Sequence, residues 1–222
     1  MPTSTVENYL KAIWNLQGNC QDDELVPVGQ VAERLEVTPG TATTMMNQLQ
    51  KKGLVDYTSR RGVRLNEKGR LAAMDVLRRH RLVETFLVEI MKFDWAEVHE
   101  DAEVLEHVVS DRLLERMDEM LQHPTHDPHG SPIPGPDGEL GNDGTMTILA
   151  NCEPGEYVLR RVRDNQASFL QWLSDHELKP GVSLALAERN AAAETLTLVV
   201  EGSERPLQIA LTAARSLLVS NR

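Results

Sequence analysis

At 222 residues, 41% apolar and 26% charged, the chain is long enough to bury one or two cores and has the composition of a globular protein. It has no apolar run near the roughly 18 residues that a bilayer crossing needs, and its N-terminus lacks the features of a signal peptide. Its two cysteines, Cys20 and Cys152, are too few and too far apart for a disulfide framework. We therefore expect a cytoplasmic protein with no membrane partner.

The net charge of −11 is unevenly distributed along the chain. Residues 48–70 hold seven Lys and Arg against two Asp and Glu, whereas residues 71–121 hold six against 13. Residues 122–222 hold eight against 13. Because phosphate binding depends on local rather than total charge, the basic segment is compatible with a nucleic-acid partner.

The first 70 residues show the pattern of three short helices followed by a hairpin. Ser4 and Glu7 form a capping-box pattern before the first helical run. Thr38 followed by Pro39 is an N-cap with proline at the first helical position. The helices are expected over about 4–16, 28–35 and 39–53, and a hairpin with a basic tip over 54–65. This order predicts a winged helix-turn-helix.

In such a motif the first turn of the second helix reads bases, and flanking basic groups contact phosphates. That turn is small and rich in hydroxyls, which predicts close groove contact with weak direct base readout. The alternative is a packing unit with a solvated charge run. The expected base-reading residues are Thr38, Pro39, Gly40, Thr41, Thr43 and Thr44, and the expected phosphate contacts are Lys51, Lys52, Arg60, Arg61 and Arg64.

The remaining chain separates into a helical part, a linker and a β-rich part. A long helix capped by Asn66 should run to about Lys92, and helical pattern then continues from Asp94 to about 121, broken by an N-cap at Ser110. Residues 123–144 are rich in Pro, Gly and Asp and predict a loop. Five short β-type runs follow, interrupted by one helix over 166–175, and suggest a small barrel.

Ionisable residues at helical spacing indicate a metal site in the helical part. His80 and Glu84 share one helix face, and His99, Glu103, Glu106 and His107 form a stripe on the next helix. Oxygen-rich ligation without thiolate suits Mn(II) or Fe(II) better than a structural zinc site. Two alternatives remain open: a solvated surface stripe, and a carboxylate-bundle metalloenzyme, although no histidine here has the glutamate three residues earlier that such bundles use.

The chain resembles the diphtheria toxin repressor and manganese transport regulator family of metal-dependent repressors. The resemblance rests on ENYLKAIW, RRHRLVETFL, VHEDAEVLEHVVSDRLLERMD and the linker PHGSPIPG. It implies an α+β, multi-domain homodimer, not an enzyme, that binds a palindromic double-stranded DNA operator, takes no small organic substrate, and represses metal uptake or homeostasis genes. The implied domains are a winged helix-turn-helix over 1–72, a helical dimerisation and metal-binding domain over 73–141, and a small SH3-like β-barrel over 142–222.

The resemblance also implies two metal sites. The primary set would be Asn8, Glu103, Glu106 and His107, and the ancillary set His80, Glu84, His99, Asp127, His129 and Asp164. Iron-selective members carry cysteine where this chain has Glu103, so Mn(II) is favoured and Fe(II) stays possible. Manganese members place aspartate where Asn8 stands, which makes Asn8 a weaker, neutral ligand. A metal-independent winged-helix regulator is the alternative function.

Overall fold

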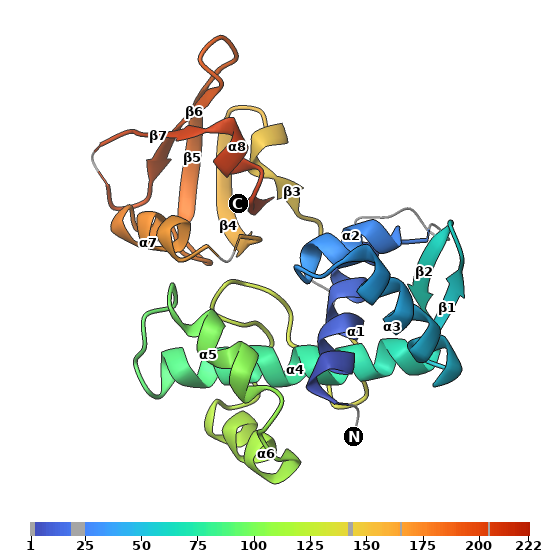
Figure 1. Cartoon of the computed structure of the whole chain (residues 1–222). Helices are drawn as coiled ribbons and strands as arrows, with labels where there is room; N and C mark the ends of the chain where they lie inside the picture. The colour runs from blue at the N-terminus through green and yellow to red at the C-terminus, as the bar shows by residue number, and fades with distance from the viewer. Residues whose placement is uncertain (1–2, 19–24, 142–143, 165, 204) are drawn as a thin grey trace. The chain divides into compact units, whose positions relative to one another are not determined.

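The computed structural model describes residues 3–18, 25–141, 144–164, 166–203 and 205–222, so Cys20 lies outside the described residues. The chain divides into two compact units (Figure 1). The N-terminal unit is Met1–His80 with Pro134–Leu140, and the C-terminal unit is Arg81–Ile133 with Gly141–Arg222. No described helix combines the length and the apolar character that a bilayer crossing requires.

The N-terminal unit confirms the predicted winged helix. Its core contains fully buried Leu10, Ile13, Met46 and Leu49, which the helical spacing places on inward faces. Its elements in chain order are α1 (Ser4–Gln17), α2 (Val28–Arg34), α3 (Pro39–Lys51), β1 (Val55–Thr58), β2 (Gly62–Leu65) and the first part of α4 (Glu67–Glu89).

Side-chain caps begin α3 and α4 as predicted, but not α1. Thr38 Oγ1 accepts a hydrogen bond from the Thr41 backbone N–H, and Asn66 Oδ1 accepts one from Gly69 N–H. The capping box expected at Ser4 is wrong, because Ser4 is already helical and Thr3 is the N-cap without a side-chain bond. The Glu7 N–H donates instead to the Thr3 carbonyl.

The wing is an antiparallel hairpin in which Val55 pairs with Leu65 and Thr58 with Gly62. An isolated bridge between Val26 and Val63 joins it to the segment before α2. Gly62 has φ +139°, and a Cβ there would lie 2.5 Å from the Val26 carbonyl oxygen. Only glycine suits this position, because both the backbone angle and the close approach exclude a side chain.

In the C-terminal unit, the end of α4 packs with α5 (Val98–Leu105) and α6 (Asp111–Met120) around Leu82, Val83 and Ala102. Ser110 Oγ accepts from Leu113 N–H, which confirms the predicted N-cap. Helix α5 ends at Leu105, so Glu106 and His107 lie in the turn after the helix rather than in it. The chain must turn there to reach the α6 cap.

The β-rich part is a six-stranded antiparallel sheet ordered β3-β8-β4-β5-β6-β7. The expected closed barrel is wrong: among the described residues β3 pairs only with β8 and β7 only with β6, so both are sheet edges. Strand β8 was not among the predicted runs. The elements are β3 (Thr147–Ile148), η1 (Leu149–Asn151), β4 (Gly155–Val162), α7 (Ala167–Asp175), β5 (Ser183–Asn190), β6 (Thr195–Val200), β7 (Leu207–Ala210), α8 (Leu211–Ala214) and β8 (Leu217–Asn221).

Candidate metal centre and DNA-reading surface

The first turn of α3 presents threonine methyls and acceptor oxygens to solvent. Thr43 Oγ1 donates to the Pro39 carbonyl at 2.8 Å, and Thr44 Oγ1 donates to the Gly40 carbonyl at 2.9 Å. These bonds use the hydroxyl protons within the helix. Since Thr38, Pro39, Gly40, Thr41 and Thr44 are exposed and Thr43 is half-buried, the surface is one of shape and methyl groups rather than charged donors.

Basic side chains flank this turn in the same unit. Lys51 and Lys52 at the end of α3 are exposed, as are Arg60 and Arg61 in the wing turn, where Arg60 has φ +63°. Arg64 differs, because its Nε donates to Asp56 Oδ2 at 3.1 Å on the neighbouring strand. The wing tip therefore offers two exposed guanidinium groups, while the third basic residue of the wing has a carboxylate partner.

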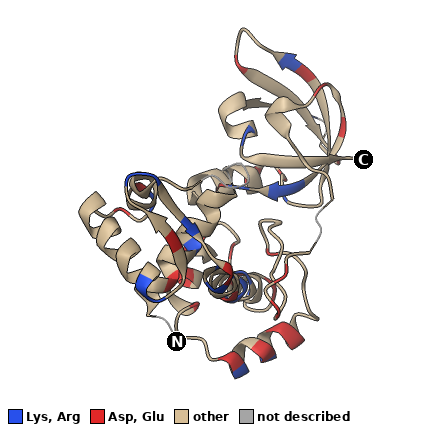
Figure 2. Cartoon of the chain, turned by 90° about the vertical axis from the view of Figure 1, so that its right-hand side faces the viewer, with Lys and Arg blue, Asp and Glu red and all other residues tan. Residues whose placement is uncertain are grey.

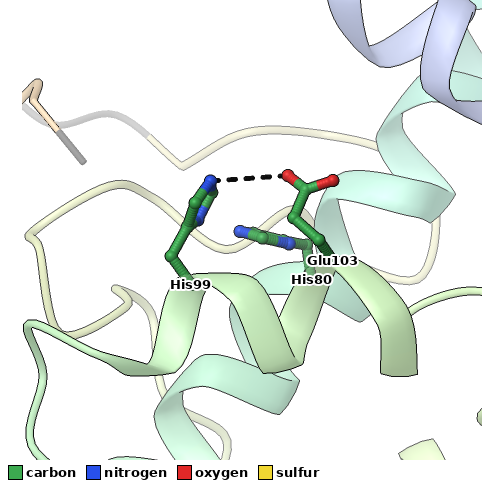
Figure 3. Close-up of side chains that lie close together, drawn as sticks. All are labelled: His80, His99 and Glu103. Atoms are coloured by element: carbon green, nitrogen blue, oxygen red, sulfur yellow. Dashed lines mark ion pairs between the residues drawn. The ribbon is translucent and has the colours of Figure 1, made fainter. Parts of the chain in front are cut away.

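Five of the predicted ancillary residues fall into two groups, and Glu103, which was predicted for the primary set, joins the first of them. The first consists of His80, from α4, with His99 and Glu103 from α5; each offers a ligand atom, and these atoms lie within 4.8 Å of one another (Figure 3). His99 Nε2 lies 3.5 Å from Glu103 Oε1, because the two residues are one helical turn apart.

The second group lies inside the C-terminal unit and is almost completely buried; it consists of Glu84, Asp127 and His129. Its ligand atoms also lie within 4.8 Å of one another, and the residues are 2%, 8% and 3% exposed. His129 Nδ1 is 3.7 Å from Glu84 Oε2, while Glu84 Oε1 is 3.0 Å from His99 Nδ1. We call this group the buried cluster. Glu84 thus joins it to the first group.

A tight loop that begins at Asp127 supplies two of the three residues of the buried cluster. Asp127 Oδ1 accepts from the backbone N–H groups of His129 (2.9 Å) and Ser131 (2.8 Å), and the Asp127 N–H donates to the Ser131 carbonyl. This side-chain turn leaves Oδ2 facing Arg81, whose Nε is 3.6 Å away. The loop therefore holds its own carboxylate in place without help from a ligand.

Burial and charge perturb both loop groups. Burial first, and then the charge of Glu84, raise the pKa of Asp127, against the lowering effect of Arg81. For His129, burial alone would lower the pKa, but the hydrogen bond and charge of Glu84, with Asp127, outweigh it and raise the pKa. Two carboxylates in one buried site repel each other, and both pKa shifts favour the protonated form of the group.

The other predicted ligands lie elsewhere. Glu106 is fully buried, and its Oε1 lies 3.5 Å from His107 Nε2. Asn8 is in α1, and among the described residues none donates a hydrogen bond to its buried Oδ1. Asp164 belongs to neither group; its Oδ1 caps the turn before α7 by accepting from Gln166 N–H at 3.0 Å.

Apolar side chains reach the surface along α5 and α6. Val104 and Val108 are 68% and 71% exposed, and Leu113 and Met120 are also exposed. Acidic residues recur along α6 between them (Figure 2). Exposed apolar side chains next to charged ones are typical of a surface that another protein covers when they form a contiguous patch.

Two family models match the chain. An N-terminal DNA-binding domain of iron-dependent repressors matches residues 1–63, and an iron-dependent repressor metal-binding and dimerisation domain matches residues 66–135. The diphtheria toxin repressor of Corynebacterium diphtheriae is 36% identical over 199 residues, which cover 84% of this chain and 85% of that protein. The chain belongs to the diphtheria toxin repressor and manganese transport regulator family.

This repressor also resembles the iron-dependent repressor IdeR of Mycobacterium leprae, with 29% identity over 213 residues and 90% of each chain covered. A solved structure of a manganese-dependent transcriptional repressor in complex with manganese is 33% identical, with a TM-score of 0.89 over 98% of this chain and 100% of that one. The protein is a metal-responsive, DNA-binding transcriptional repressor with a dimerisation domain, and its family consists of regulators, not enzymes.

Two neighbours of the buried cluster were missed by sequence reasoning. Arg81 follows His80 directly, and its position one turn from Glu84 could have indicated a contact with the site. Trp95 contacts His129 from a segment between two helices, where neither periodicity nor a motif marks it. The tertiary fold alone brings Trp95 to the cluster.

Proposed function

We propose that this repressor is activated by Mn(II), with Fe(II) as the second candidate, and that the buried cluster is one of its cation sites. The observation that carries the proposal is the burial of two carboxylates and an imidazole within 4.8 Å of one another. Such a group is costly to bury unless a cation compensates it. Two carboxylates and one imidazole, without thiolate, match the preference of Mn(II) and Fe(II).

A cation-free alternative has specific support. Arg81 and a protonated His129 could together neutralise Glu84 and Asp127, because Arg81 lies 3.6 Å from Asp127 and the pKa of His129 is raised. The two cases differ in stoichiometry. If a cation binds here, Glu84→Gln removes one bound Mn(II) per chain; if protons and Arg81 suffice, the count is unchanged.

For the primary site we propose Asn8, Glu103, Glu106 and His107, the set that the family resemblance implies. The buried Asn8 Oδ1, which receives no hydrogen bond from the described residues, supports an oxygen ligand at that position. Full burial of Glu106 supports a compensating charge beside it. Glu103, an acid where thiol-bearing relatives have cysteine, favours Mn(II). The ancillary ligands would be His80, Glu84, His99, Asp127 and His129, with Asp164 as the further candidate.

We further propose a palindromic operator that controls metal uptake or homeostasis genes, read by a two-fold dimer. Such a dimer engages both half-sites only when its reading helices lie about one DNA turn, ~34 Å, apart. Ligands drawn from α1 and from residues 103–107 would favour one such arrangement, which couples cation binding to operator affinity. The domain limits 1–72, 73–141 and 142–222 remain our proposal; the matches over 1–63 and 66–135 support the first two.

The decisive experiment is operator binding titrated in parallel with Mn(II), Fe(II), Zn(II) and a chelator. We expect Mn(II) to raise affinity most and the chelator to abolish specific binding. Glu106→Ala should abolish the Mn(II) response while the protein stays folded and dimeric by light scattering. Glu100→Ala, which replaces an exposed acid on α5, the helix before the turn that carries Glu106, is the matched control and should respond normally. A full Mn(II) response in Glu106→Ala would rule out the primary-site assignment.

A further inference from the structure

The imidazole of His129 is held from the side opposite Glu84. His129 Nε2 lies 3.0 Å from the Trp95 backbone carbonyl, to which it donates, and the His129 ring stacks on the Trp95 indole with centroids 5.3 Å apart and planes at 28°. With its proton on Nε2, the neutral ring turns the Nδ1 lone pair toward Glu84. A carbonyl partner of this kind fixes the tautomer and orientation of a histidine ligand.

Trp95 is also part of the core beneath the β-sheet. Its side chain is 4% exposed and packs in the hydrophobic cluster formed by the sheet strands and α7. The indole Nε1–H donates to Ser174 Oγ on α7, and Lys179 Nζ lies 5.6 Å from the indole centroid. A single residue therefore contacts the buried cluster with its backbone and ring face, and α7 with its ring edge.

The loop that carries His129 is joined to strand β4 as well. The Val162 N–H donates to the His129 carbonyl at 2.9 Å, and Arg161 Nε donates to the Gly130 carbonyl at 3.1 Å. Gly130 has φ +82°, and a Cβ there would lie 2.0 Å from the Arg160 carbonyl oxygen, so the loop touches β4 without an intervening side chain. The loop and Trp95 thus each connect the buried cluster to the sheet.

We propose that Trp95 is a positioning residue for the His129 imidazole and transmits cation occupancy of the buried cluster to α7 and the β-sheet. The inference rests on the proposed cation site. A cation held by Glu84, Asp127 and His129 would restrict the loop and the His129 ring, and the Trp95 ring stacked on it would then hold α7 more firmly. In this role Trp95 connects the metal to α7 and the C-terminal sheet through packing and a hydrogen bond.

The test uses the full chain, with Mn(II) binding counted by electron paramagnetic resonance of the free ion and α7 followed by hydrogen exchange. Trp95→Ala removes the stacking on His129, and we expect about a 10-fold loss of Mn(II) affinity at one site. Trp95→Phe keeps a stacked ring and should restore most of it. Trp172→Phe, a half-buried aromatic substitution on α7 that does not contact His129, should bind as the unaltered chain does.

Ser174→Ala separates the two halves of the proposal. It leaves the His129 contacts intact, so Mn(II) affinity should be unchanged, while the added protection that Mn(II) gives to α7 should shrink. A Trp14→Phe/Trp172→Phe chain keeps Trp95 as its sole tryptophan. Paramagnetic Mn(II) should quench its fluorescence, and His129→Ala should abolish that quenching.

The outcomes separate the two levels of inference. If neither Glu84→Gln nor His129→Ala changes the number of bound Mn(II) ions, the buried cation site is wrong and this inference with it. If those variants lose one ion but Trp95→Ala binds as tightly as the unaltered chain, the positioning role is overturned and the cation site stands. Equal Mn(II)-dependent protection of α7 in Ser174→Ala and the unaltered chain would overturn the transmission to the sheet.

Discussion

Helix α3 and the buried cluster both present polar side chains, but they place them in opposite environments. On α3, the hydroxyls of Thr43 and Thr44 donate to carbonyls of their own helix, and what reaches solvent is small and uncharged. In the buried cluster, Glu84 on α4 meets Asp127 and His129 from a loop that is distant in sequence, and together they concentrate charge where water is excluded. The hydroxyls of the predicted DNA-reading surface are thus hydrogen-bonded within their own helix, whereas the buried cluster depends on the tertiary fold and holds charges that a bound cation would compensate.

This difference indicates that α3 and the buried cluster depend on metal to different degrees. A helix whose hydroxyls hydrogen-bond to its own carbonyls keeps its shape with or without metal. We therefore do not expect metal binding to form the predicted DNA-reading surface. A cluster that gathers distant segments changes their mutual stability when a cation arrives. We therefore expect metal to act on the stability with which these segments pack together and not on the shape of α3.

The largest expected effect is on metal-dependent stability. With Mn(II) at about 100 times its dissociation constant, one site adds about 2.7 kcal/mol to stability, which corresponds to a rise in Tm of roughly 5–10 °C for a chain of this size. Glu84→Gln should lose that part of the rise, as measured by thermal denaturation with Mn(II) and with chelator. An undiminished rise in Tm in Glu84→Gln would mean that the buried cluster does not carry metal-dependent stability.

Next comes the basic wing tip. The double variant Arg60→Ala/Arg61→Ala should weaken binding to operator and to unrelated DNA alike, roughly 10- to 100-fold at 0.1 M salt, and lower the salt slope by about 2. Arg64→Ala is the control from the same wing, and its effect should be smaller because Arg64 is bound to Asp56. A loss confined to the operator would mean that the arginines read bases.

The smallest effect concerns the α3 cap. Thr38→Ala removes the acceptor for the Thr41 N–H, which should cost about 1 kcal/mol and lower Tm by roughly 2–4 °C without changing the Mn(II)-induced rise. Thr44→Ala removes a hydroxyl that only returns to its own helix, and its change should stay within about 0.5 kcal/mol. If Thr38→Ala altered the Mn(II) response, α3 would not be independent of the metal.

Local rules predicted the elements well and the sheet topology poorly. The starts of α3, α4 and α6 followed from Thr38, Asn66 and Ser110, because a cap acts within three residues. The closed barrel was wrong because periodicity indicates strands but not their partners. Strand β8, at the end of the chain, lies between β3 and β4, and no turn signal in the sequence announces that pairing.

The candidate site could be predicted in part. Helical spacing alone indicated His80 with Glu84 and His99 with Glu103, whereas Asp127 and His129 came only from the family resemblance, since a loop has no periodicity to read. The separation of the ancillary residues into two groups that meet at Glu84 depends on side-chain directions in three dimensions. For the same reason the stacking between Trp95 and His129 could not be predicted from the sequence.

The near-complete burial of Glu84, Asp127 and His129 has a consequence in time. An ion held by three such residues has little direct path to water, so its departure requires the loop at 127–131 to part from β4. The lifetime of the loaded state would then be set by this local opening rather than by how fast metal disappears from the surroundings. Repression would then persist for some time after the metal concentration falls, because the bound ion would leave slowly.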